Sequence, residues 1–230
     1  PKRYEFKHEA DVQKWLNLIR GQHLPYDPRL AGDDQLRPPL PFEDKRLLAT
    51  LKHTFWFLPS VAACHAMGDL LQQPENGFFH DYKIVVAAGA KAGIGLDALP
   101  PVRNAISRAG LGTRSITLSC MKLTTGITVP EWSGIFMLRN LNSPETYFQA
   151  AFRVQSPWTT TEVDPVDGEA QHYLKPSCYL LDFSPNRALR LITDYATQLD
   201  PDPDISKETK VEEFLKYLPV LCYDGYRMQE

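Results

Sequence analysis

With 230 residues, the chain is long enough for one α/β domain with a substantial core, and its 43% hydrophobic and 23% charged residues are values of a globular protein. No apolar run approaches the roughly 20 residues that a membrane-spanning helix needs, and no N-terminal signal pattern is present. The formal net charge of -3 weakly disfavours an autonomous nucleic-acid-binding domain, because such domains are usually basic. Pro1 is not an initiator Met, so we expect a processed or excised piece of a longer product.

The cysteines predict neither a zinc site nor a disulfide framework. Cys64, Cys120, Cys178 and Cys222 lie far apart and form no C-x-x-C pair, so we expect no bound metal. The first three lie in apolar stretches, which is typical of reduced cysteines in a core. Reduced thiols predict a cytoplasmic location.

The N-terminal region, residues 1–47, is predicted to hold a helix and a proline-rich connector. Val12, Leu16 and Ile19 recur at helical spacing within a helix expected over 8–20. Prolines are then frequent between 25 and 41, which indicates a linker that arrives from something upstream. A short helix over 42–52 leads into the first strand.

The central region, residues 48–200, alternates strands with helices. Strands are expected at 54–58, 82–88, 116–118, 134–138 and 177–183, with helices at 61–72 and 101–109, from 143 onward, and at 186–199. This alternation predicts an α/β fold with a doubly wound, mainly parallel sheet. The polar stretch 159–173 is expected to be an exposed loop, and residues 201–230 a C-terminal helix (207–218) with a tail.

Two strings of residues between 115 and 158 carry the functional information. The first is L-T-T-G-I-T-V-P at 123–130, a polar turn between two buried strands. The second is Y-F-Q-A-A-F-R-V-Q at 147–155, on a helix that Ser143 caps and Pro144 begins. Gln149 and Arg153 are four residues apart and therefore share one helix face.

These strings resemble motifs V and VI of superfamily 2 helicases and translocases, above all those of restriction-modification enzymes. The resemblance covers roughly 54–199 and is strongest over 115–158. It implies the second, C-terminal RecA-like domain of an ATP-dependent DNA motor, a P-loop NTPase-like fold without the P-loop. Ser60, between a strand and a helix, occupies the place of motif IV and can cap that helix.

The resemblance also implies roles for particular residues. Arg153 would be the arginine finger that stabilises charge on the transferred phosphoryl group, with Gln149 beside it. The nucleotide side of the site would comprise Gly126, Thr128, Gln149 and Arg153. The nucleic-acid side would comprise Ser60, Thr124 and Thr125.

The partners follow from what this sequence lacks. It contains no G-x-x-x-x-G-K-[ST] string to cradle phosphates and no D-E-x-H string for magnesium. ATP and Mg²⁺ would therefore be shared with an upstream RecA-like domain of the same polypeptide or of a partner subunit, and the chain alone is not expected to hydrolyse ATP. Double-stranded DNA, with an attached nuclease or methyltransferase module, completes the expected assembly.

The sequence departs from the family pattern at two positions. Thr128 stands where many motif V sequences have Asp, and Ser156 stands where a second Arg is usual. Gln155 or Arg139 is a candidate replacement for that second Arg. The departures leave open a non-catalytic nucleic-acid-binding or interaction module that keeps the fold without turning over ATP.

Two further patterns point to other chemistry, and both are weak. G-x-x-x-G-I-G at 89–95 follows a strand as in short-chain dehydrogenases, but the sequence has no Y-x-x-x-K pair. P-D at 201–202 and E-x-K at 208–210 resemble a magnesium nuclease site. The E-x-K string opens a predicted helix, whereas a nuclease needs it on a strand.

Overall fold

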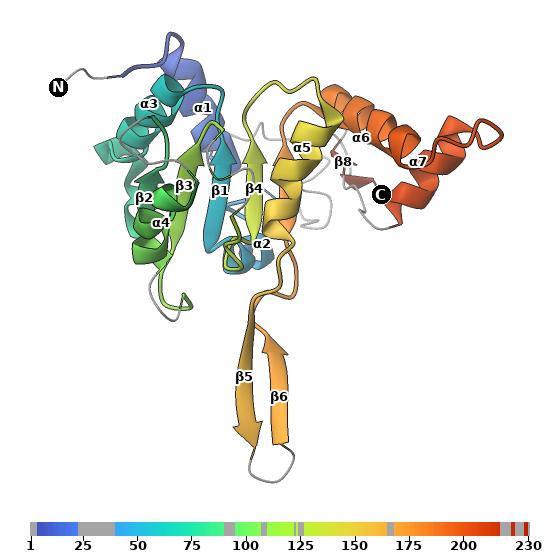
Figure 1. Cartoon of the computed structure of the whole chain (residues 1–230). Coiled ribbons are helices and arrows are strands. Elements are labelled where there is room, and N and C mark those ends of the chain that lie inside the picture. The colour runs from blue at the N-terminus through green and yellow to red at the C-terminus, as the bar shows by residue number, and fades with distance from the viewer. Residues whose placement is uncertain are drawn as a thin grey trace, which may run out of the picture.

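The structure is a computed structural model that describes residues 4–22, 40–89, 95–106, 110–121, 123, 127–164, 168–216, 222–223 and 228–229. Figure 1 shows a central sheet with helices on both of its faces. The strand order is β2 (Lys83–Val86), β3 (Ser115–Ser119), β1 (His53–Phe57), β4 (Gly134–Met137) and β7 (Tyr179–Asp182). All neighbouring strands are parallel, so the α/β prediction with a parallel sheet flanked by helices is confirmed.

The central strand β1 explains why the chain folds around this sheet. All five of its residues are buried, since helices cover both faces. Side chains alternate across a strand, so Phe55 and Phe57 enter one core, whereas Trp56 enters the other. An apolar strand of this kind is stable only between two helical layers.

One layer consists of α1 (Glu9–Ile19), α3 (Val61–Leu71) and the turns that flank these two helices. Leu16 and Ile19 of α1 are fully buried in the same core as Trp56. Phe42 stacks on Phe136 of β4 with ring centroids 5.6 Å apart. Phe42, predicted as the first residue of a short helix, therefore contributes to the core. The short helices α2 (Lys45–Thr50) and η1 (Pro74–Asp81) flank this layer.

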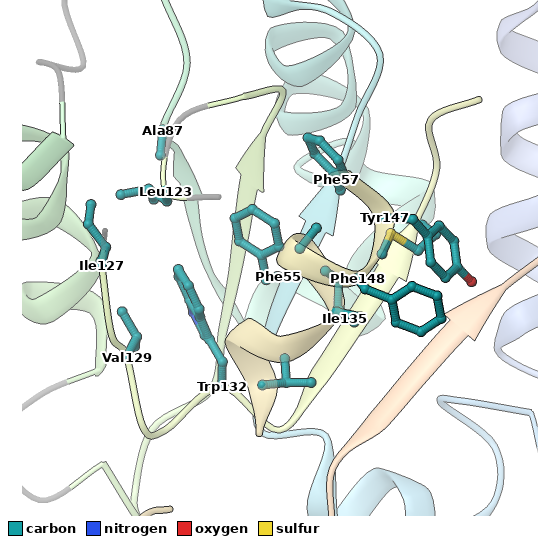
Figure 2. Packing of buried hydrophobic residues seen from close by; sticks show 14 of the residues in the cluster. Phe55, Phe57, Ala87, Leu123, Ile127, Val129, Trp132, Ile135, Tyr147 and Phe148 are labelled. Carbon is teal, nitrogen blue, oxygen red and sulfur yellow. The ribbon is translucent and has the colours of Figure 1, made fainter. Parts of the chain in front are cut away.

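The other layer consists of α4 (Leu99–Ile106), α5 (Pro144–Ala151), the short helix η4 (Phe152–Val154) and α6 (Pro185–Leu199). Figure 2 shows its core, where Trp132 lies against Phe55 and Phe148 of α5 packs nearby. The Phe55 and Trp132 ring centroids are 4.8 Å apart. Residues 127–132 thus run through this layer on their way to β4. The helix η3 (Gly95–Ala98) precedes α4, and α7 (Lys207–Leu215) packs on α6.

The prediction of a loop at 159–173 is wrong, because most of this stretch forms β-strands. Residues Thr159–Asp164 (β5) and Gly168–Tyr173 (β6) pair as an antiparallel hairpin that projects from the body (Figure 1). The stretch has no apolar face to bury, so its polarity looked like a loop, but threonine and tyrosine favour extended backbone. A last short pair, β8 (Cys222–Tyr223) with β9 (Met228–Gln229), ends the described chain. No helix among the described ranges is long and apolar enough to cross a membrane.

His53, the first residue of β1, makes two buried hydrogen bonds near the amino ends of the central strands. Its Nε2 lies 2.8 Å from the Gly110 carbonyl oxygen, and its Nδ1 lies 2.9 Å from Ser115 Oγ. A carbonyl only accepts, so Nε2 carries the proton and Nδ1 accepts from the hydroxyl. This arrangement suits the neutral ring, and burial lowers the pKa of His53.

We expect stability to fall in acid because of this histidine. The unfolded chain binds the proton near pH 6.5, above the pKa in the folded state, so stability is lost as the pH falls below 6.5. Thermal unfolding between pH 7.5 and 5 should show a smaller loss in His53→Gln than in the wild type. His80→Gln, at an exposed ring, is the control. Equal pH slopes in His53→Gln and wild type would contradict this assignment.

Candidate functional site

Ser60 lies at the carboxyl end of β1, where α3 begins. Its Oγ accepts a hydrogen bond from the Ala63 backbone N–H at 3.1 Å, so the predicted N-cap is confirmed. The side chain is exposed. The helix N-terminus is thus open to solvent, as contact with a phosphate would require. The DNA contact itself stays a prediction.

Arg153 joins the two strings that carry the sequence resemblance. Its Nη1 donates to the Ile127 carbonyl oxygen at 2.7 Å, and its Nε donates to the Gln149 carbonyl oxygen at 3.3 Å. The helix is set by its N-cap, where Ser143 Oγ accepts from the Thr146 N–H at 3.2 Å. The side chain of Gln149 is exposed one turn before Arg153. Tertiary structure therefore brings the predicted Gln149–Arg153 pair next to the residue that follows Gly126.

The turn itself is only partly described. Thr124, Thr125 and Gly126 lie outside the described residues, so their predicted roles stay predictions. Thr128 has an exposed side chain, and its carbonyl oxygen accepts from Arg103 Nη2 of α4 at 3.0 Å. The backbone after the turn is therefore fixed to α4 as well as to η4.

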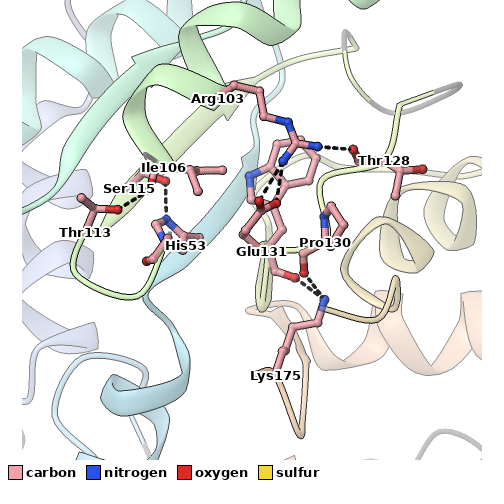
Figure 3. A network of polar contacts seen from close by, with 11 residues as sticks. His53, Arg103, Ile106, Thr113, Ser115, Thr128, Pro130, Glu131 and Lys175 are labelled. Carbon is pink, nitrogen blue, oxygen red and sulfur yellow. Dashed lines mark hydrogen bonds and ion pairs between the residues drawn. The ribbon is translucent and has the colours of Figure 1, made fainter. Parts of the chain in front are cut away.

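Three cationic side chains hold residues 127–132, which we call the clamped segment. Arg153 binds the carbonyl of Ile127, and Arg103 binds the carbonyl of Thr128. Arg103 Nη1 also pairs with both carboxylate oxygens of Glu131 at 2.8 Å (Figure 3). Lys175 donates to the carbonyls of the last part of the segment. Arg103 and Lys175 were not foreseen from the sequence, because nothing in its spacing links them to residues 127–132.

Arg139 cannot take the place of a second arginine beside Arg153. It follows β4 at the carboxyl edge of the sheet, where its Nη1 donates to the Cys120 carbonyl oxygen at 2.7 Å. Its guanidinium also lies over the Phe57 ring, 5.6 Å from the centroid. α5 then runs back to the amino edge, so the two arginines lie at opposite ends of this helix, which is about 12 Å long. Gln155 follows η4 with an exposed side chain and stays a candidate.

The nuclease-like pattern has a structural explanation. Lys210 Nζ is buried and donates to the carbonyl oxygens of Asp200, at 2.6 Å, and Asp202. Its ammonium therefore ties the loop before α7 to the helix. Over the described ranges, no group of three His, Cys, Asp or Glu could hold a metal ion. The glycine turn at 89–95 lies largely outside these ranges.

Comparison with known proteins adds one informative relative. No family model matches the chain. Over 180 residues, or 78% of its length, the chain is 31% identical to a protein of Mycoplasma pneumoniae provisionally named type II restriction enzyme and methyltransferase RM.MpnORF110P C-terminus. The chain spans 24% of the length of that relative, so it is similar to one part of a considerably longer protein.

Proposed function

We propose that the chain is the C-terminal motor domain of an ATP-dependent DNA helicase or translocase that belongs to a restriction-modification enzyme. The observation that carries the proposal is the hydrogen bond from Arg153 to the carbonyl of Ile127, which puts the two helicase-like strings in direct contact. The parallel sheet between two helical layers is compatible with a RecA-like domain. The similarity to the Mycoplasma pneumoniae protein supports the restriction-modification context.

Arg153 has the properties of an arginine finger in this proposal. Phosphoryl transfer places charge on the γ-phosphate oxygens, and a preplaced guanidinium stabilises that charge. Arg153 is half-buried, and its Nη2 has no hydrogen-bond partner in the part of the chain that the structure describes. The two backbone contacts fix the plane of the guanidinium and leave Nη2 for an anionic ligand. Gln149 then offers its amide to the nucleotide or to a water molecule.

The remaining parts of the machinery come from both sides of a cleft. ATP and Mg²⁺ are held mainly by an upstream RecA-like domain, with Gly126 and Thr128 of this chain near the nucleotide. Ser60, Thr124 and Thr125 contact the phosphate backbone of double-stranded DNA. Residues 124–132 include both the nucleotide-side and the DNA-side residues of this turn. They therefore transmit movement at the nucleotide to the DNA.

In this proposal, residues 48–200 form the RecA-like domain, flanked by residues 1–47 and 201–230. Helix α1 packs on the sheet of that domain through Leu16 and Ile19. A nuclease or methyltransferase module in the same assembly would use the translocation. This last point rests on what the name of the Mycoplasma pneumoniae relative says of that protein.

The test is ATP turnover by the full-length natural protein, measured with and without double-stranded DNA. We expect DNA to stimulate phosphate release, and we expect residues 1–230 alone to release none. Single-stranded DNA and RNA of the same length identify the preferred nucleic acid. A full-length protein that binds DNA without ATP dependence and without turnover would overturn the motor assignment.

DNA binding without ATP dependence or turnover would favour the alternative function, a non-catalytic nucleic-acid-binding or interaction module. The observations behind it are Thr128 and Ser156, which stand where the family usually has Asp and a second Arg. DNA affinity measured with and without a non-hydrolysable ATP analogue separates the two functions. A motor changes its DNA affinity when it binds nucleotide, whereas a module without an ATP site does not.

A further inference from the structure

Lys175 is a buried cation in the stretch between β6 and β7. It is 8% exposed, and its ammonium donates to three carbonyl oxygens: Pro130 at 2.7 Å, Trp132 at 2.9 Å and Val154 at 2.7 Å. An ammonium has three donors, so every donor is used. A buried charge is tolerated only when it is bonded in this way. The side chain therefore has one well-defined position.

The three acceptors of Lys175 come from the two segments that meet at Arg153. Pro130 and Trp132 belong to the clamped segment, and Val154 directly follows Arg153 in η4. The bond from Arg153 to Ile127 is one link between these segments, and the Lys175 ammonium is a second. Figure 3 shows the contact of Lys175 with Pro130. Together with the burial of Val154 in the core, the two links fix the orientation of η4, and with it the direction of the Arg153 side chain.

The root of the hairpin holds Lys175 in turn. The Leu174 backbone N–H donates to the Trp158 carbonyl oxygen at 2.8 Å, which closes the hairpin just before Lys175. The Trp158 ring lies 6.2 Å from that of His53, centroid to centroid. It also covers Gly110, where φ is +66° and an added Cβ would come within 2.8 Å of the indole. The stretch that carries Lys175 is thus tied through Leu174 and Trp158 to His53 of β1.

We propose that Lys175 is a positioning residue that fixes the turn carrying Arg153 so that its guanidinium points at the nucleotide. The inference rests on the proposed function, because it assigns Arg153 its target. Lys175 itself is enclosed by backbone and touches no substrate. Its effect on the reaction is therefore expected in the rate of the chemical step rather than in ATP binding.

The charge state of Lys175 gives an independent way to test its positioning role. Burial lowers the pKa of Lys175 to about 8, while Cys178 and Glu131 act in the opposite direction. Glu131 is in turn paired with Arg103 of α4. Above pH 8 the neutral amine has two N–H donors for three carbonyls, so the link to η4 weakens. An arginine at this position keeps its charge through this range.

The experiment measures kcat and KM for ATP in the full-length protein with saturating DNA, from pH 6.5 to 9.5. We expect Lys175→Met to lower kcat by about 10- to 100-fold, with a much smaller change in KM, as for a small misplacement of a catalytic group. The wild type should lose kcat above pH 8, and Lys175→Arg should restore activity there. Lys207→Met, an exposed lysine on α7, is the matched control. Circular dichroism identifies the temperatures at which each variant is folded, and kcat values are compared only there.

The outcomes separate this inference from the proposed function. Wild-type protein without DNA-stimulated turnover would overturn both. Turnover that is lost in Arg153→Ala but normal in folded Lys175→Met would overturn the positioning role alone. If Lys175→Met does not fold, the wild-type pH profile decides, since constant kcat from pH 7 to 9.5 would also overturn it.

Discussion

Arg153→Ala is expected to lower the DNA-stimulated ATP turnover of the full-length protein by about 10³-fold or more, the range known for arginine fingers. The loss should fall on kcat, because the guanidinium acts on charge that develops only in the transition state. The variant also loses stability, since a hydrogen bond from a charged donor is worth about 1.5–3 kcal/mol and Arg153 makes two to backbone carbonyls. Steady-state phosphate release and thermal unfolding of the same preparation measure both quantities.

Two further variants make this result interpretable. Arg190→Ala removes an exposed arginine that bonds Asn142 at 3.2 Å, and it should leave turnover unchanged. Arg153→Lys keeps a positive charge but loses the planar fork that reaches Ile127 and a phosphate together, so it should restore little activity. Full turnover in a folded Arg153→Ala protein would show that Arg153 is only a structural link between η4 and the clamped segment.

Asp182→Ala is expected to destabilise the fold by about 3–5 kcal/mol, the cost of breaking a buried ion pair. The Asp182 carboxylate, at the end of β7, is 3% exposed and pairs with Arg187 of α6. It also accepts from Tyr147 Oη of α5 at 3.1 Å and from the Ser184 N–H at 2.9 Å. Burial and the nearby Asp182 carboxylate raise the pKa of Tyr147, so the phenol stays a donor. Removal of Asp182 would leave Arg187 and Tyr147 without their shared acceptor.

Urea unfolding followed by circular dichroism measures this effect. Asp194→Ala, at an exposed position of α6, the helix that carries Arg187, should change the free energy of unfolding by less than about 0.5 kcal/mol. The double variant Asp182→Ala with Arg187→Met should recover part of the loss, because it leaves no unpaired charge in the core. A loss below about 1 kcal/mol in Asp182→Ala would show that water replaces the missing contacts.

The regular elements of this fold could be predicted because local chemistry specifies them. Strand β1 is an apolar run between a histidine and a Pro-Ser turn, and the start of α5 carries its own Ser143 cap and Pro144. Both signals lie within a few residues of the element that they define. The same is true of the helix face that Gln149 and Arg153 share. The sequence also supplied the family resemblance, through two short strings in the right order.

Only the tertiary structure decided how these strings meet and what holds them. The bonds that hold the clamped segment and η4 together join residues 21 to 45 positions apart: Arg153 to Ile127, and Lys175 to Pro130 and Val154. Their acceptors are backbone carbonyls, which every residue possesses, so no pattern of side chains marks them in advance. The β5–β6 hairpin was missed because its sequence is polar and lacks the run of apolar residues that marks the strands of the central sheet. By itself, therefore, the sequence determined the strands of the central sheet, the main helices around it and the candidate residues, whereas the β5–β6 hairpin, the sheet order and the cations that orient Arg153 depend on contacts that only the folded chain creates.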